Sequence, residues 1–222
     1  SGEGNGRWQQ AEGRARHGRH HDSARGNGLA SVRDAQFTLG QGHAAEMGSE
    51  LRQASKSFYG YDFTFTDIAE LDITDAGKTR EFIGSTDPDW IINCAAYNAV
   101  DKAESEPDEA MLINSASVKN IAEAIKNSAC RFIHLSTDYV FSGEACVPYD
   151  EYSVTGPRTA YGRSKLSGEN AALAHNRTMI IRTSWLYSAY GTNFVKTILT
   201  RAGENKPLRV VFDQAGTPTW AA

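Results

Sequence analysis

The sequence has no long apolar run and no strong excess of charge of either sign. No stretch approaches the roughly 20 consecutive apolar residues of a membrane-spanning helix, and the N-terminal residues contain no apolar signal-peptide segment. The formal net charge is -4, which gives no basic surface for nucleic acid or for an anionic membrane. We therefore expect a soluble protein with no nucleic-acid partner and no membrane partner.

Cysteine is scarce as well, with only Cys94, Cys130 and Cys146 present. Their odd number and wide spacing argue against a disulfide framework, and no CxxC pair marks a zinc or redox site. We interpret all three as reduced thiols. This interpretation predicts a cytoplasmic protein.

Lysine, isoleucine, proline and tyrosine are all missing from residues 1–47, which hold nine of the 20 glycines and four of the six histidines. Such a low-complexity segment lacks the apolar periodicity needed to bury a face, so we expect it to be disordered or non-native. One hypothesis is a frameshifted or misassembled reading frame, which a correctly framed source transcript would refute. A flexible tail explains His17, His20 and His21 without a metal site, and we predict none.

From residue 48 onward, strand patterns alternate with helix patterns. Short apolar or alternating runs predict strands, and apolar residues at helical spacing predict helices. The expected elements in chain order are a helix from Gly48, a strand at 61–66, a helix at 74–83, a strand at 90–96, a helix at 107–128, a strand at 131–135, a helix at 161–174, a strand at 179–182, a helix at 194–202 and a strand at 208–212. This order predicts one α/β domain over residues 48–222, with a doubly wound, Rossmann-like parallel sheet.

Polar and small residues follow three of the expected strands. In an open parallel sheet, ligands bind at the carboxyl ends of the strands, so these residues are candidates for a binding site. They are Asp67 after one strand, Ala95, Ala96 and Tyr97 after the next, and Ser136, Thr137, Asp138 and Tyr139 after the third. A purely structural interpretation is also open, in which the hydroxyl and carboxyl groups cap a turn and the tyrosines pack in the core.

Tyr161 and Lys165 are four residues apart on an expected helix, so they share one of its faces. An ammonium group beside a phenol lowers the phenol pKa and suits it to proton transfer. A Tyr-x-x-x-Lys match is common by chance. Its convergence with the Thr137 hydroxyl on one crevice favours a catalytic site.

Six sequence blocks resemble the dTDP-4-dehydrorhamnose reductases of the extended short-chain dehydrogenase/reductase superfamily. They cover residues 48–222 in the family's order. The blocks are Asp67–Asp75, Asn93–Glu104, His134–Phe141, Tyr161–Glu169, Arg182–Tyr187 with Asn193–Thr197, and Asp213–Thr219. Six ordered blocks are far more specific than any single motif.

The resemblance implies NAD(P)H-dependent reduction of the 4-keto group of dTDP-4-dehydro-6-deoxy-L-mannose to dTDP-L-rhamnose, a donor for bacterial cell-envelope polysaccharide. It implies that Tyr161 is the general acid, that Lys165 holds the nicotinamide ribose and lowers the tyrosine pKa, and that Thr137 binds the carbonyl oxygen. Substrate contacts are expected from Ser136, Asp138, Tyr139 and Trp185. Cofactor contacts are expected from Gly48, Asp67, Asp72, Ile73, Ala95, Ala96, Tyr97 and Lys165.

The chain departs from the family at both ends. The expected apolar strand and its Gly-x-x-Gly-x-x-Gly phosphate turn are missing, and Gly48 alone matches the last glycine of that turn. Glu46 stands near the expected position of the pyrophosphate. At the other end, the chain stops soon after Thr219, which predicts a truncated C-terminal substrate lobe.

Further expectations concern the choice of cofactor and the oligomeric state. Asp67 would accept hydrogen bonds from a ribose 2′-hydroxyl and repel a 2′-phosphate, which favours NADH over NADPH. Some relatives in this family have a Mg²⁺ ion at a homodimer contact, and Glu50 is the matching residue here; the sequence itself decides neither the dimer nor the metal. Two alternatives stay open: an NDP-sugar epimerase or dehydratase, which shares Tyr-x-x-x-Lys, and a non-catalytic, reductase-like regulatory or binding subunit.

Overall fold

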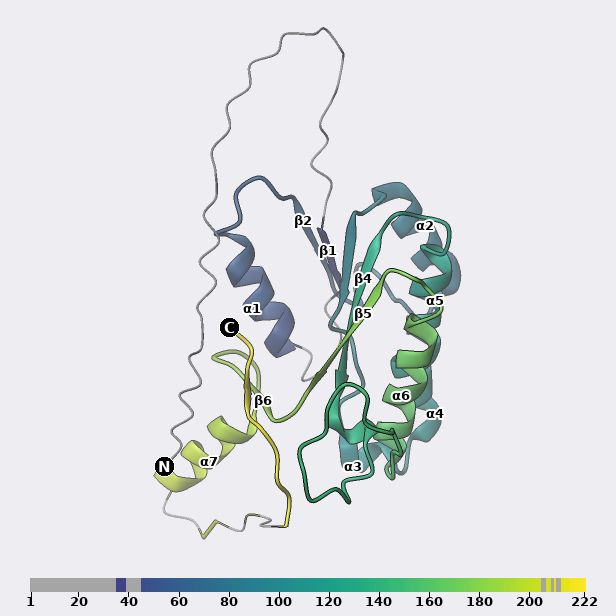
Figure 1. Cartoon of the computed structure of the whole chain (residues 1–222). Coiled ribbons are helices and arrows are strands. Elements are labelled where there is room, and N and C mark those ends of the chain that lie inside the picture. Colours follow the sequence, from purple (N-terminus) through teal and green to yellow (C-terminus); the bar gives the residue numbers. More distant parts are fainter. Residues whose placement is uncertain (1–34, 39–44, 205–206, 209, 211–212) are drawn as a thin grey trace, which may run out of the picture. The chain divides into compact units, whose positions relative to one another are not determined.

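The computed structural model describes residues 35–38, 45–204, 207–208, 210 and 213–222. Its centre is a five-stranded, all-parallel sheet with the strand order β2-β1-β3-β4-β5 (Figure 1). The strands are β1 (Ala35–Thr38), β2 (Phe63–Thr66), β3 (Trp90–Asn93), β4 (Arg131–Thr137) and β5 (Thr178–Thr183). The crossover at β1 and β3 confirms the predicted doubly wound α/β fold.

Helices alternate with these strands, and in Figure 1 α2, α5 and α6 lie along one face of the sheet while α1 lies beside the other. The described helices are α1 (Ala45–Ser55), α2 (Ala76–Thr86), α3 (Val100–Ala103), α4 (Pro107–Met111), α5 (Ser117–Ala124), α6 (Ala160–Ala172) and α7 (Phe194–Gly203). Two short strands, β6 (Leu186–Tyr187) and β7 (Thr219–Trp220), pair separately from the main sheet. No described helix combines the length and the apolar character that crossing a bilayer requires.

The main core lies between the sheet and the helices α2, α5 and α6. Phe132 on β4 and Ile91 on β3 meet Val118, Ile121 and Ile125 from α5 and its C-terminal end, and all five are at most 2% exposed. The three α5 residues recur at helical spacing, so they form one apolar stripe against the sheet. Full burial of each large apolar side chain contributes roughly 1.5–3 kcal/mol. This packing fixes the direction of β4, which carries Thr137.

The first strand of the fold was not expected, because the sequence predicted no strand before the first helix. Strand β1 lies between β2 and β3 and pairs in parallel with both, placing Phe37 beside Phe65 and Ile92. It lacks a long apolar run, so the pairing from two sides, not local propensity, accounts for it. The expected low-complexity segment at 1–47 and the phosphate turn fall largely on residues 1–34 and 39–44, outside the described part of the chain.

Two other elements differ in detail. The single helix expected at 107–128 is interrupted by a π-helical turn at Leu112–Ala116, between α4 and α5. The expected strand at 208–212 lies partly outside the described residues. Its two described members, Leu208 and Val210, belong to no strand and are 42% and 50% exposed.

Candidate active site

A cavity of about 450 Å³ lies where β3, β4 and β5 end. Its lining residues come from the strand ends, from α1 and α6, and from the segment around β6 and α7. Its lining includes Cys94, Ala96, Asn98, Ser136, Thr137, Asp138, Tyr139, Tyr161, Lys165, Thr183, Trp185, Asn193 and Phe194. The three predicted catalytic residues, Thr137, Tyr161 and Lys165, and all four predicted substrate-binding residues therefore share one cavity.

Thr137 ends β4 and caps the 3₁₀ turn at Asp138–Val140. Its Oγ1 accepts a hydrogen bond from the Tyr139 amide at 3.2 Å and donates one to Asp138 Oδ1 at 3.0 Å. These bonds bear out the structural interpretation of Thr137 as a turn cap, and its predicted role in binding a carbonyl oxygen stays a prediction. Because a hydroxyl has a single proton, Thr137 must turn from Asp138 to donate to a bound carbonyl oxygen.

Tyr161 lies in the first turn of α6. Thr159 caps that helix by accepting from the Gly162 amide at 3.0 Å, and Glu104 Oε1 accepts from the Ala160 amide at 2.6 Å. The phenol ring packs edge-on against Tyr139, with 5.6 Å between the ring centroids and 75° between the ring planes. These contacts hold the Tyr161 ring in the cavity wall, where it is 7% exposed.

The pKa of Tyr161 is raised to about 12, which is opposite to the direction expected from its neighbour Lys165. Burial is the main cause, and it outweighs a hydrogen bond with Thr137 that lowers the pKa; the Asp138 charge raises it further. The Lys165 ammonium donates instead to the Leu135 carbonyl oxygen at 2.6 Å. The phenol therefore stays protonated at neutral pH, as a general acid must.

Lys165 lies one helical turn after Tyr161 and is 3% exposed. Burial lowers its pKa to about 8, and the Glu169 carboxylate is the main group that opposes this shift. Glu169 in turn forms a two-point ion pair with Arg182 on β5, with Nε to Oε1 at 2.9 Å and one terminal nitrogen to Oε2 at 2.6 Å. The lysine therefore sits in a buried, largely charge-balanced surrounding.

Asn114 positions the site although the sequence pattern does not single it out. It lies fully buried in the π-helical turn, where Oδ1 accepts from the Tyr97 amide at 2.8 Å. Its Nδ2 donates to the Tyr97 carbonyl at 3.1 Å and to Ser164 Oγ at 2.9 Å. One side chain thus ties the exit of β3 to α6, the helix that carries Tyr161 and Lys165. Its partners are 17 and 50 residues away in the chain, so no local signal could reveal it.

The predicted cofactor residues at the exit of β3 divide into two groups. Ala96 lines the cavity. Ala95 packs in the core, and its amide donates to Asn93 Oδ1 at 2.9 Å. Tyr97 donates its hydroxyl proton to Glu106 Oε2 at 2.8 Å and is not among the lining residues.

The predicted adenine-side residues also lie off the cavity lining. Asp67 is exposed after β2, and its Oδ1 accepts from the Ile68 amide at 2.5 Å. Asp72 accepts from the Thr74 hydroxyl and amide, which lowers the Asp72 pKa. Ile73 is 6% exposed and packs in the main core, so its side chain is not available to a ligand. Gly48 is buried within α1.

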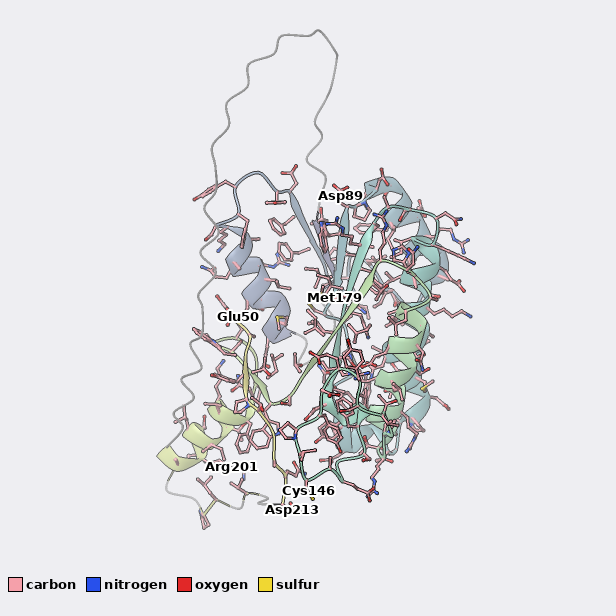
Figure 2. All side chains as sticks on the ribbon, in the orientation of Figure 1. Glu50, Asp89, Cys146, Met179, Arg201 and Asp213 are labelled. Atoms are coloured by element: carbon pink, nitrogen blue, oxygen red, sulfur yellow. The ribbon has the colours of Figure 1, made fainter. Side chains whose placement is uncertain are left out.

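Glu46 is a lining residue with consequences for cofactor binding. It is 3% exposed in the first turn of α1 and stands against Gly191. The same cavity is lined by Lys165, Ala96 and Thr137, and a carboxylate in this first turn of α1 would repel an anionic group there. Among the described residues, no group of three His, Cys, Asp or Glu side chains could hold a metal ion, and Glu50 on α1 (Figure 2) is itself buried.

Comparison with known proteins gives one family. The family model described as the RmlD substrate binding domain matches residues 37–222. The chain is similar to the dTDP-4-dehydrorhamnose reductase of Sinorhizobium fredii, with 56% identity over 60% of this chain and 46% of the relative. It is also similar to that of Escherichia coli, with 42% identity over 81% of this chain and 61% of the relative. The chain thus spans about half to three fifths of these relatives' lengths.

The chain also resembles solved structures that carry the same name. The dTDP-4-dehydrorhamnose reductase of Bacillus anthracis, solved in complex with NADP, has a TM-score of 0.79 and 37% identity. The match covers 85% of this chain and 66% of that chain. The Clostridium acetobutylicum enzyme of the same name gives the same TM-score and coverage at 39% identity. The family model covers residues 37–222, and both the sequence relatives and the solved structures carry the same name, so the chain belongs to the dTDP-4-dehydrorhamnose reductase family.

Proposed function

We propose that this chain reduces the 4-keto group of dTDP-4-dehydro-6-deoxy-L-mannose to dTDP-L-rhamnose, with NADH or NADPH as the reductant. The observation that carries this proposal is the meeting of Thr137, Tyr161 and Lys165 in one cavity at the strand ends. A hydroxyl, a neutral phenol and an ammonium group around one polar centre suit the reduction of a carbonyl. Family membership supplies the substrate class.

The chain's own residues handle the proton and the developing charge. The Tyr161 phenol, kept protonated by burial, donates its proton to the oxygen on C4 as that oxygen becomes an alkoxide. The Thr137 hydroxyl, released from Asp138, donates a hydrogen bond to the same oxygen. The positive charge of Lys165 then stabilises the phenolate that remains on Tyr161.

The nicotinamide cofactor supplies the hydride when it is bound. Lys165 and Ala96 would hold its nicotinamide and ribose end. We favour NADH because the exposed Asp67 carboxylate at the end of β2 would repel a 2′-phosphate. The NADP bound in the Bacillus anthracis relative makes NADPH the competitor. A comparison of the KM values for NADH and NADPH, in the parent and in Asp67→Asn, decides between them.

One assay tests the proposed activity. The protein is mixed with reduced cofactor and the 4-keto sugar nucleotide, and the absorbance of the reduced nicotinamide is followed. Oxidation that requires the sugar nucleotide supports the proposal. Absence of oxidation, together with no NADH or NADPH binding by calorimetry, would exclude an active reductase.

A second candidate function is a non-catalytic, reductase-like binding subunit, and Glu46 is the observation that favours it. Its buried carboxylate in the first turn of α1 opposes binding of the cofactor phosphates. This candidate predicts sugar-nucleotide binding without turnover. Glu46→Gln would then strengthen NADH binding measured by calorimetry, while unchanged affinity would remove the reason to prefer this candidate.

We further propose that the chain forms a homodimer with Mg²⁺ at its contact, held by Glu50. Glu50 is buried on α1, so the contact requires its carboxylate to become accessible. Sedimentation velocity with Mg²⁺ and with EDTA tests this. A dimer that dissociates in EDTA and fails to form in Glu50→Gln supports the proposal, and a monomer under all conditions contradicts it.

A further inference from the structure

Trp185 has a backbone conformation that tryptophan rarely adopts. Its φ is +46°, in the left-handed region, and Asp87 is the other non-glycine residue with positive φ in the described part of the chain. Bulky side chains persist there only where surrounding contacts enforce the conformation, and such residues cluster at ligand sites. Trp185 also lines the cavity that contains Tyr161 and Thr137.

The segment Asp213–Thr219, which begins at Asp213 in Figure 2, supplies those contacts. Ser184 Oγ donates to the Thr217 carbonyl at 2.5 Å, and the Thr219 amide donates to the Trp185 carbonyl at 3.4 Å. The pairing of β6 with β7 then continues this attachment from Leu186 onward. The segment that follows α7 therefore forms hydrogen bonds with both Ser184, the residue before Trp185, and the carbonyl of Trp185 itself.

Gly216 of that segment lies against the indole itself. A Cβ atom at this position would stand 3.1 Å from both Cε2 and Nε1 of Trp185, which is closer than ordinary van der Waals contact. The indole has freedom to yield, because Trp185 is 45% exposed. Its other neighbour is Phe194, with 6.5 Å between ring centroids, and Phe194 lines the same cavity. A side chain at position 216 would therefore push the indole away by a few tenths of an ångström.

We propose that Gly216 is a positioning residue: because it lacks a side chain, the Asp213–Thr219 segment can hold the Trp185 indole as a wall of the sugar-nucleotide site. This inference rests on the proposed function for the identity of the ligand. The indole offers a flat apolar face to a pyranose ring held between it and the Thr137 and Tyr161 side. Trp185 is then a binding residue and Gly216 a positioning residue that acts through it.

The first test reports on the indole without any ligand. In a background where Trp8, Trp90 and Trp220 are replaced by phenylalanine, Trp185 is the single fluorophore of a chain that has four tryptophans. Gly216→Ala is expected to shift its emission and its acrylamide quenching. Gly203→Ala is the matched control, because a Cβ there meets nothing within 4 Å. Identical spectra for the parent and Gly216→Ala would overturn the proposal.

The second test reports on the ligand. Gly216→Ala is expected to raise the KM for the 4-keto sugar nucleotide by roughly tenfold, with NADH affinity by calorimetry unchanged. In a Trp185→Leu background the same substitution should have no further effect, because the indole that it displaces is gone. Equal losses from Gly216→Ala in the two backgrounds would overturn the proposal. Altered fluorescence with no sugar-nucleotide binding in the parent would support the indole contact and overturn the proposed function instead.

Discussion

The Glu169 carboxylate and the Arg182 guanidinium form a two-point ion pair one helical turn beyond Lys165. Glu169 is 2% exposed, and Arg182 also lies over the Phe141 ring, with its guanidinium carbon 4.9 Å from the ring centroid. A buried carboxylate is costly unless it is paired and hydrogen-bonded. The pair therefore stabilises a negative charge near the Lys165 ammonium group in the protein interior.

Removing one member of this pair should therefore be strongly destabilising. Arg182→Met leaves the Glu169 charge buried without its partner, and we expect a loss of about 3–5 kcal/mol in the free energy of unfolding. Urea denaturation measures it. Arg158→Met is the control, since its ion pair with Glu144 is exposed and should contribute at most about 1 kcal/mol. Similar losses for both variants would contradict the role given to the buried pair.

Stability should also depend on pH through Lys165. Its pKa is about 8 in the folded protein and 10.5 when unperturbed, so between these values the unfolded chain binds more protons than the folded one. The free energy of unfolding contributed by this group therefore rises as pH increases from 8 to 10.5, and this contribution is lost as pH falls back through 8.

The measurement is urea denaturation across that pH range for the parent and for Lys165→Met. Each unit of pKa difference corresponds to about 1.4 kcal/mol, so the rise from this group is up to about 3 kcal/mol. The free energy of unfolding of the parent minus that of Lys165→Met should show this rise. A flat difference between pH 8 and 10.5 would show that burial does not lower the lysine pKa.

Gly168 should not tolerate a side chain. A Cβ there would collide with the Asn114 backbone carbonyl, where α6 passes the π-helical turn. Gly168→Ala must separate these elements, and we expect a loss of about 1–3 kcal/mol by thermal or urea unfolding. Gly84→Ala in α2 is the matched helical control, because a Cβ there meets nothing within 4 Å and alanine favours helix by about 1 kcal/mol. A stabilising Gly168→Ala would refute this close contact.

Much of this architecture could be predicted from local patterns. The apolar run at Trp90–Asn93 and the helical spacing of Val118, Ile121 and Ile125 each encode their own element. That Thr137, Tyr161 and Lys165 line one cavity was predictable, because the carboxyl ends of parallel strands lie at one edge of the sheet. The cavity that they line follows from that topology.

What the sequence could not reveal depends on contacts between distant residues. Strand β1 is defined by pairing on both sides and not by its own composition. Asn114 becomes important only through Tyr97 and Ser164. The direction of the Tyr161 pKa shift was predicted wrongly because burial, which spacing does not report, outweighs the neighbouring charge.

The proton-donating role of Tyr161 is the central claim, and Tyr161→Phe tests it most directly. Turnover of the 4-keto sugar nucleotide and NADH affinity are measured for the parent, for Tyr161→Phe and for Tyr152→Phe, an exposed control at 93% exposure. We expect Tyr161→Phe to lose about 10²- to 10⁴-fold in kcat with NADH affinity unchanged, and Tyr152→Phe to match the parent. Retained turnover in Tyr161→Phe, or loss of NADH binding in place of turnover, would contradict the account.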